Sequence, residues 1–486
     1  MPGVVVTTAV RTGPTATQTA ATATAFVAGV TTRGPSGQAV LISSLAQYED
    51  IFGGYTSSGY VHQTAKTFFE EGGSRMYVSR AVGDSAAAAT CALLDDAGTP
   101  ATVVTLTAAG KGTWANSGGL EATVTNPTGS TFQVKILVDG DVVYTSQTHT
   151  NKTDFINEIN NSATAGLWVT AASGASTDIP TPVTGKDFSG GSNGSAVDAD
   201  NIVTALGEFT YDLGPGAIMA PGFYDSTTIN ELIDNANTNH RVVITSVDEG
   251  TDVTTAVSDI STYVGATNSE HVAAFWPWVK VPNGLLTMTV PPEGFVAAKR
   301  AVVHNQRAAF HPYAGSAAVA TYVVGLETTV SKEDTDTADA GNLNTIRVIQ
   351  NSIRVYGARS LSDDTDNFRF ITSQEVLNHI VYESERSLEE LLFQPIDGRK
   401  TIFARVASAL TAILDPLAKA GGLYALYNAN GGMIDPGYSV VVSDALNPVS
   451  QLAEGTIVAK VGARVSSIGD TIEVEVTKSS LTASLV

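Results

Sequence analysis

Residues 109–113 have the composition of a phosphate-binding loop. They read Ala-Gly-Lys-Gly-Thr, and a lysine among glycines can hold phosphate oxygens through backbone N–H groups and its ammonium. Nucleotide-binding loops follow the order G-x4-G-K-[ST], whereas Lys111 is followed here by Gly112 and position 105 is Thr. The order of residues is wrong, so we expect no nucleotide site.

The seven histidines and the single cysteine form no metal-ligand pattern. His304 and His311 are seven residues apart and have no His or Cys companion at the spacing that zinc ligands use. Cys91 alone can form neither an internal disulfide nor a cysteine-based zinc site, which favours a reducing compartment. We therefore expect structural or surface histidines and no cofactor.

Two carboxylates and an aromatic cluster are the remaining candidates for chemistry. Asp248 follows the apolar run VVITSV, and a carboxylate at the end of a strand can be catalytic in an α/β protein. An α/β hydrolase that used Asp248 or Asp225 would need a nucleophile or a metal, yet the chain has no G-x-S-x-G or H-E-x-x-H sequence. Trp276 and Trp278 could stack a ligand, but aromatic residues in strands usually pack in a core or an interface. The sequence thus predicts no enzyme.

Length and composition indicate a folded, multidomain and strongly acidic protein. At roughly 150 residues per domain, 486 residues give about three domains, and 43% hydrophobic content argues against general disorder. With 27 Lys and Arg against 48 Asp and Glu, the net charge of −21 disfavours binding of nucleic acid. Mostly apolar runs such as 317–326 reach half of the ~20 residues that span a bilayer. No leader pattern is visible in residues 1–29, and we expect no membrane insertion.

Alternating strands and helices predict a split α/β core. A helix over 61–71 ends at Gly72-Gly73 and is followed by a strand over 76–82. The pattern resumes with strands at 217–220, 242–247 and 271–276 and helices at 228–237 and 253–264. Such alternation favours a partly parallel sheet covered on both faces. Residues 84–196 are rich in Ala, Thr, Ser and Gly with short alternating runs, and we interpret them as an inserted, mainly β domain.

The C-terminal third predicts a second α/β unit. The acidic stretch 333–339 has the character of an exposed loop, followed by strands at 346–349 and 353–356. One amphipathic helix has Thr372 and Glu375 at capping-box spacing, and a second has apolar residues at helical spacing from 402 to 417. Pro416 should kink this second helix or restart it behind Asp415. A strand at 438–442 completes the unit.

Both ends of the chain have the pattern of extended segments. The valines Val4, Val5 and Val6 lie in a Thr-rich stretch without helical periodicity. At the other end, the sequence TIEVEVT (471–477) alternates, so that Ile472, Val474 and Val476 face one side of a strand. A half-buried strand so near the C-terminus can find its partner in another molecule by strand addition.

Short motifs recur in a definite order along the sequence. The set covers nearly the whole chain, apart from portions of the insertion. It consists of Pro2-Gly3-Val4, AFVAG (25–29), Gly34-Pro35, FGG (52–54), FFEEGG (68–73) with Tyr77-Val78, GTWAN (112–116), Pro221-Gly222, Pro277-Trp278, PPEG (291–294), YGARSL (356–361), Phe370-Ile371, FQP (393–395), Asp444 and Asn447. In order and spacing this set resembles the tail sheath proteins of contractile-tailed bacteriophages and related contractile injection systems. The N-terminal VVVTTAV and Phe368 depart from that family's usual residues.

The resemblance implies a multidomain α/β (α+β) sheath subunit without enzymatic activity. It implies an N-terminal extended arm (1–24), a split α/β core (25–83 and 197–340), an outward-facing inserted β domain (84–196), a C-terminal α/β domain that accepts neighbouring strands (341–465) and a C-terminal arm strand (466–486). Such subunits form a helical six-fold homopolymer around a tail tube protein, together with baseplate and tail terminator proteins. They assemble in the bacterial cytoplasm into the virion tail and contract to drive the tube through the host envelope.

Particular residues carry these expectations. The inter-subunit strand contacts expected are Val4, Val5, Val6, Ile472, Val474, Val476, Ile353, Val355, Tyr438 and Val440. The expected hinges, which would let subunits rotate while they stay linked, are Gly13, Pro14, Gly462 and Gly469. The alternative from another class is a secreted or surface-attached adhesin or lattice module, which predicts a leader or anchor signal and discrete monomers in solution.

Overall fold

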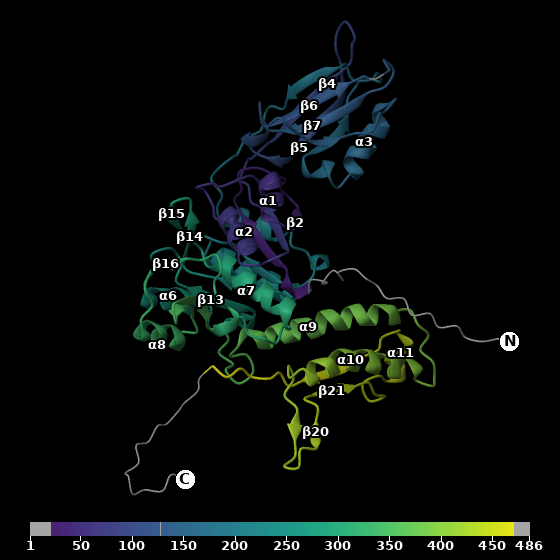
Figure 1. Cartoon of the computed structure of the whole chain (residues 1–486). Helices are drawn as coiled ribbons and strands as arrows, with labels where there is room; N and C mark the ends of the chain where they lie inside the picture. The colour runs from purple at the N-terminus through teal and green to yellow at the C-terminus, as the bar shows by residue number, and fades with distance from the viewer. Residues whose placement is uncertain (1–20, 127, 471–486) are drawn as a thin grey trace, which may run out of the picture.

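The computed structural model describes residues 21–126 and 128–470, and its central element is an eight-stranded sheet (Figure 1). The strand order is β18-β17-β13-β12-β11-β1-β3-β2. Neighbouring strands run parallel except for β3–β2 and β17–β18, the antiparallel pairs at the two edges. The strands are β1 Ala25–Gly29, β2 Ala39–Ile42, β3 Met76–Arg80, β11 Ala217–Met219, β12 Val242–Thr245, β13 Val272–Trp276, β17 Asn344–Ile349 and β18 Ser352–Tyr356.

Helices cover both faces of this sheet because its central strands are apolar on both sides. In β1 all five residues are buried, with Ala25 and Val27 in one apolar cluster and Phe26 and Ala28 in the other. The first face is covered by α1 Leu45–Phe52, α2 Val61–Glu70 and α7 Glu293–Gln306, and the second by α4 Ala199–Leu206, α5 Ser226–Thr238, α6 Val253–Ser261 and α8 Lys332–Ala340. The predicted doubly covered, mostly parallel sheet is confirmed.

The segment between β3 and α4 forms two antiparallel sheets and one helix at one end of the molecule (Figure 1). One sheet contains β4 Ala88–Leu94, β5 Thr102–Lys111 and β9 Val169–Ser173. The other contains β6 Leu120–Thr125, β7 Gln133–Val138, β8 Asp141–Thr145 and β10 Val183–Asp187, and the helix is α3 Lys152–Asn161. The segment enters and leaves side by side, because Asp84 N donates to Ser195 Oγ and Ser195 N donates to Asp84 O.

The C-terminal helices lie at the opposite end from the insertion (Figure 1). They are α9 Ile371–Leu388, α10 Thr401–Lys419 and α11 Val449–Ala453. Two separate two-stranded sheets accompany them, formed by β19 Leu426–Tyr427 with β20 Met433–Asp435, and by β21 Tyr438–Val441 with β22 Lys460–Ala463. We refer to residues 371–470 as the C-terminal domain.

Minor elements complete the described chain. A three-stranded sheet beside the core contains β14 Val279–Asn283, β15 Leu286–Val290 and β16 Gly325–Leu326. Short 3-10 helices are η1 Ala21–Ala23, η2 Thr113–Ala115, η3 Ala165–Leu167, η4 Tyr211–Leu213, η5 Ser269–His271, η6 Gly315–Ala317 and η7 Glu389–Leu391.

Four local expectations differ from the structure. The acidic stretch 333–339 lies in helix α8, which Ser331 and Asp334 cap at its N-terminus. Helix α9 starts at Ile371 after Phe370, so that the predicted capping box at Thr372 is absent. Helix α10 continues through Pro416 to Lys419, because proline near the last turn removes only one backbone donor. Strands β17 and β18 belong to the core sheet through the β13–β17 pair, which moves the boundary expected at residue 341.

Helix α10 has the length and apolar composition of a membrane-spanning helix among the described residues. Its apolar side chains gather on one stripe, where Ile402, Val406 and Leu410 are buried against Leu388 and Leu391. The stripe packs within the C-terminal domain, as expected of an amphipathic core helix.

Candidate assembly interface

The backbone N–H groups of residues 111–113 in the glycine-rich loop already have acceptors within the protein. Lys111 N donates to Ser36 Oγ, Gly112 N to Ala87 O and Thr113 N to Asn193 Oδ1. A Cβ at Gly110 would lie 1.8 Å from the Gly34 carbonyl oxygen, so protein already fills the space beside the loop. These glycines therefore serve close packing between the insertion and the core.

The two candidate carboxylates, Asp225 and Asp248, have different surroundings. Asp225 is the N-cap of α5 and accepts hydrogen bonds from Thr228 N and Oγ1. Asp248 lines a cavity of about 270 Å³ beyond β12, beside Tyr224 and Tyr263. The lining contains no histidine or cysteine, and the only serine there, Ser246, donates to Phe275 O. This arrangement supplies no nucleophile with an adjacent base.

The tryptophans serve packing, as predicted. Trp276 and Trp278 are each 2% exposed, and their indole N–H groups donate to Thr251 O at 2.8 Å and to Val247 O at 2.7 Å. Among residues 21–126 and 128–470, no group of three or more His, Cys, Asp or Glu side chains is arranged to hold a metal ion.

A buried ionic cluster joins the C-terminal domain to the core. Arg300 Nε lies 2.7 Å from one carboxylate oxygen of Glu375, and His304 Nε2 lies 2.7 Å from the other. Arg300 also donates to Thr22 O at 2.5 Å. Burial opposes ionisation of Glu375, but Arg300 and His304 outweigh it and hold the pKa of the carboxyl below its usual value. The contacts link α7, α9 and the beginning of the described chain, so they orient the C-terminal domain.

The β21–β22 sheet has unpaired backbone groups on its edges. Arg464 N donates to Gly437 O, so the N–H group of Arg464 and, two residues earlier on the same side of the strand, that of Gly462 point toward β21. With Ser439 paired to Gly462, the next inward pair, the backbone groups of Tyr438 and Val440 point to the outer edge. No backbone partner for these outward groups occurs among the described residues. Tyr438 and Val440, both predicted as strand acceptors, thus lie on an open edge.

One face of this sheet is covered and the other is exposed. Val440 packs against the apolar stripe of α10, whereas Val441 on the opposite face is 45% exposed. A two-stranded sheet is marginally stable unless it packs on a helix or gains a strand. The β21–β22 sheet packs on helix α10, and its open edges leave room for an added strand.

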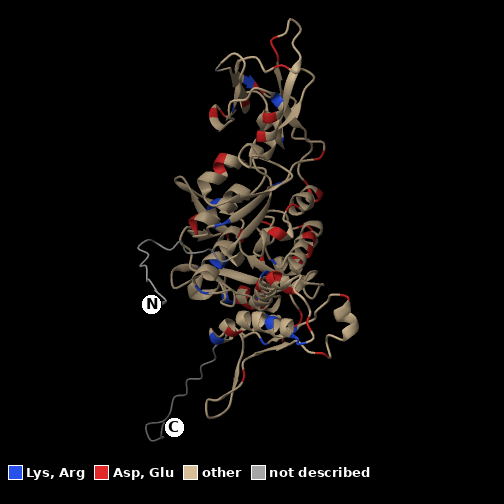
Figure 2. Ribbon diagram, turned by 90° about the vertical axis from the view of Figure 1, so that its right-hand side faces the viewer, with Lys and Arg blue, Asp and Glu red and all other residues tan. Residues whose placement is uncertain are grey.

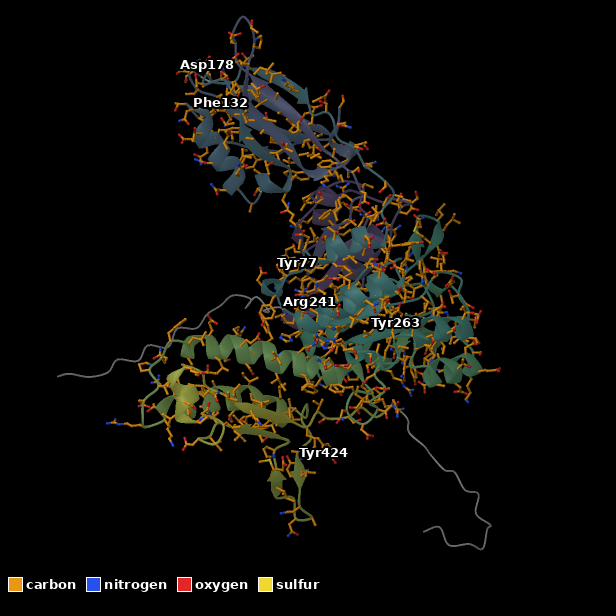
Figure 3. The ribbon with its side chains drawn as sticks, turned by 180° about the vertical axis from the view of Figure 1, so that it is seen from behind. Tyr77, Phe132, Asp178, Arg241, Tyr263 and Tyr424 are labelled. Atoms are coloured by element: carbon orange, nitrogen blue, oxygen red, sulfur yellow. The ribbon has the colours of Figure 1, made fainter. Side chains whose placement is uncertain are left out.

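Large apolar side chains are exposed around the same domain. Met433 and Ile434 on the protruding β19–β20 hairpin are 61% and 67% exposed, and Tyr424 lies at the base of this hairpin (Figure 3). Phe393 is fully exposed with φ +60°, beside an apolar groove of about 530 Å³ between α9, α10 and β22. Exposed apolar surface of this extent is typical of interaction sites. Sequence periodicity could not reveal it, because Phe393 lies in the break between two helices.

Other predicted contact and hinge residues differ or lie outside the described residues. The outer edge of β18 is occupied within the chain, since Val355 N donates to Ala318 O and Ala320 N donates to Ile353 O. Ile353 and Val355 are therefore corrected as acceptors of a neighbouring strand. Gly462 lies inside β22 opposite Ser439, where a paired strand cannot act as a hinge, and Gly469 has open space around its Cα. Val4, Val5, Val6, Gly13, Pro14, Ile472, Val474 and Val476 lie outside the described residues.

Acidic side chains are spread along the molecule and basic ones are sparse (Figure 2). The net charge of −21 makes the approach of two copies unfavourable except where charge is absent or locally reversed. The groove of the C-terminal domain, whose lining is apolar apart from a few side chains such as Glu385, and the exposed Met433 and Ile434 of the hairpin are places of low charge.

Comparison with known proteins identifies the fold. No family model and no curated protein matches the sequence. A chain of the anti-feeding prophage baseplate superposes with a TM-score of 0.56 at 15% identity, covering 99% of both chains. The sheath of an extracellular contractile injection system, PVC, in the contracted state gives 0.56 at 16% identity over 99% and 98%. The sheath tail protein Lin1278 from Listeria innocua gives 0.57 at 14% identity over 87% and 89%. The chain has the multidomain α+β fold of contractile injection system and tail sheath proteins.

Proposed function

We propose that the protein is a structural subunit of a contractile tail sheath. Subunits stack as six-fold helical rings around a tail tube and donate their N- and C-terminal arms as strands to neighbouring copies. The open edge of the β21–β22 sheet carries this proposal, because it presents the unpaired backbone groups of Tyr438 and Val440 on a helix-backed surface.

The binding free energy of one donated strand is large enough to keep two subunits connected while they rotate. About five backbone hydrogen bonds at ~0.5–1.5 kcal/mol each contribute several kcal/mol, before the burial of Ile472, Val474 and Val476. A chain connection of this kind persists while rigid subunit bodies rotate. Gly13, Pro14 and Gly469 are the positions at which we propose that the arms bend.

The sheath performs mechanical work without hydrolysing a nucleotide. The work comes from the free-energy difference between two lattice packings of one sequence, and about 1 kcal/mol per subunit is large when summed over many copies. Contraction shortens and widens the lattice and drives the tube through the host envelope. The tail tube, baseplate and terminator proteins are the partners in this proposal, and the assembled tail of the virion is its location after assembly in the host cytoplasm.

Proline substitutions test the strand acceptor residue by residue. Val440→Pro removes an outward N–H and leaves the β21–β22 bonds in place, so we expect folded subunits that form no long tubes in negative-stain electron microscopy. Val461→Pro does the same at the outer edge of β22 and identifies which edge is used.

Ser439→Pro is the matched control, since it removes an inward N–H and should destabilise the C-terminal domain itself. Deletion of residues 1–12 or 471–486 should also give soluble subunits without tubes. Normal tubes from both edge variants, or from both deletions, would refute strand donation.

A further inference from the structure

Two arginines without an ion-pair partner among the described residues face each other near one edge of the core sheet. Arg347 of β17 is paired directly with Arg354 of β18 in the antiparallel register. Like charges in directly opposite positions repel. The Nε atoms of both side chains are buried without a hydrogen-bond partner, and neither arginine has an ion-pair partner among residues 21–126 and 128–470. The described residues therefore supply no carboxylate to this pair.

Arg347 is nevertheless held in place. Its guanidinium lies 3.8 Å from the centroid of the Tyr356 ring, and its Nη1 donates to Thr335 Oγ1 at 3.0 Å. A guanidinium fixed by stacking and one hydrogen bond can still present its Nη2 group to a carboxylate.

The chain leaves the described structure at the wall of the same site. Arg347, Tyr356, Arg359 and Asp470 line a cavity of about 340 Å³. Arg359 lies 2.7 Å from Asp339 and 3.4 Å from Asp470, and Arg369 lies 3.2 Å from Asp470. Asp470 is thus fixed beside the cavity by two arginines, and residue 471 begins there.

The sequence that follows carries the missing charge. Glu473 and Glu475 are three and five residues beyond Asp470 and share one side of an alternating segment. At about 3.3 Å per extended residue they reach about 10 Å and about 17 Å from Asp470. Two carboxylates that follow the wall of the cavity lined by Arg347 match two guanidinium groups without an ion-pair partner among the described residues, in number and in sign.

We propose that residues 471–477 of the same chain dock on the Arg347–Arg354 pair through Glu473 and Glu475. Glu473 and Glu475 then contact arginines of the same chain, while Ile472, Val474 and Val476 are on the opposite side of the segment. Because one segment cannot occupy both places, home docking competes with donation to a neighbour. This last consequence rests on the proposed function, whereas the docking itself does not.

Zero-length carbodiimide coupling tests the contact on the full chain at low salt. In an Arg347→Lys or Arg354→Lys variant, the new amine should couple to Glu473 or Glu475, and peptide mass spectrometry should identify the joined peptides. Glu473→Gln/Glu475→Gln should abolish these products, and 1 M NaCl should reduce them at least tenfold by screening. Arg464→Lys is the matched control, which should couple to Asp435, its neighbour at 3.2 Å.

Isotope mixing distinguishes this chain from a second copy. When labelled and unlabelled proteins are mixed, home docking gives joined peptides from one isotopic form, and mixed forms in statistical proportion would overturn the proposal. Absence of coupling to Glu473 and Glu475 in both lysine variants, with the Arg464→Lys product present, would also overturn it.

An assembly readout separates the two proposals. Glu473→Gln/Glu475→Gln should lower the protein concentration at which tubes appear by several-fold, because the home contact no longer competes. If no variant forms tubes, the proposed function fails, and the coupling result still decides the home contact.

Discussion

The core sheet and the β21–β22 sheet differ in how their faces and edges are covered. The eight-stranded sheet is buried on both faces, and residues 318–320 of the same chain cover part of its β18 edge. The β21–β22 sheet has one covered face, and the outward groups of Tyr438 and Val440 lack backbone partners in the described chain. The core sheet therefore has both faces and part of one edge covered within one chain, whereas the C-terminal sheet has an open edge among the described residues.

A buried arginine of the core likewise has its hydrogen-bond partners within the same chain. In the core, Arg241 is fully buried and donates to Phe209 O, Thr210 O, Gly214 O and Asn235 Oδ1 (Figure 3). Its guanidinium also lies 3.9 Å from the centroid of the Phe26 ring, and burial lowers its pKa to about 9. Each of its three guanidinium nitrogens donates at least one hydrogen bond, which makes this arginine a structural connection between the residues that flank η4, helix α5 and the start of β12.

Removal of this connection should produce the largest loss of stability. Arg241→Ala leaves several buried acceptors without donors, so we expect the free energy of unfolding to fall by at least about 3 kcal/mol. Urea denaturation followed by the fluorescence of Trp276 and Trp278 measures it. The exposed Arg464→Ala should change the same quantity by less than about 0.5 kcal/mol. Equal effects of the two variants would contradict the contrast between core and C-terminal sheet.

Glu293 gives the core a defined dependence on pH. It is 1% exposed, accepts a hydrogen bond from Tyr224 at 2.7 Å, and its Oε2 has no partner among the described residues. Burial raises its pKa from 4.5 to about 7. Between these values the unfolded chain releases the proton first, so the contribution of this group to stability is full below pH 4.5 and is lost as pH rises through about 7.

Glu293→Gln should therefore have an effect that grows with pH. We expect little change at pH 4.5 and a gain of up to about 3 kcal/mol in the free energy of unfolding at pH 8, measured by urea denaturation. Glu389→Gln, on the exposed η7, should leave the pH profile unchanged. A constant difference between wild type and Glu293→Gln at both pH values would exclude the charge as the cause.

Amide hydrogen exchange should distinguish the outward and inward N–H groups of strand β21. In unassembled protein, the outward amides of Tyr438 and Val440 should exchange at least about tenfold faster than the inward amide of Ser439, a difference of about 1.4 kcal/mol. The amides of β12, which is paired on both sides, should exchange more slowly than either class. Equal protection of Ser439 and Val440 would show that the edge is already covered, and would remove the main support for strand donation.

Periodicity predicted the elements that have strong apolar patterns. Helices α9 and α10 and strands β17 and β18 follow directly from such patterns. Helix α8 escaped prediction because it is acidic and buries only Ala338, although Ser331 and Asp334 carry the capping signal. The cover over Ile353 and Val355 comes from residues more than thirty positions earlier, and backbone pairing over such distances leaves no mark in local composition.

The candidate interface was predictable only in part. Tyr438 and Val440 were found because a strand pattern is local, and the structure adds the direction of their backbone groups. Phe393, the Arg347–Arg354 pair and the partners of Arg241 depend on contacts between distant segments. Burial of a charged side chain such as Arg241 contradicts its usual preference, so composition alone predicts the opposite.

The inserted domain begins and ends at neighbouring positions, so another domain could take its place. Because Asp84 and Ser195 are hydrogen-bonded to each other, any guest domain whose own termini lie close together could be fused there without separating β3 from α4. In the proposed polymer such fusions would display their guests at regular intervals, as a scaffold for arranging enzymes or antigens in space.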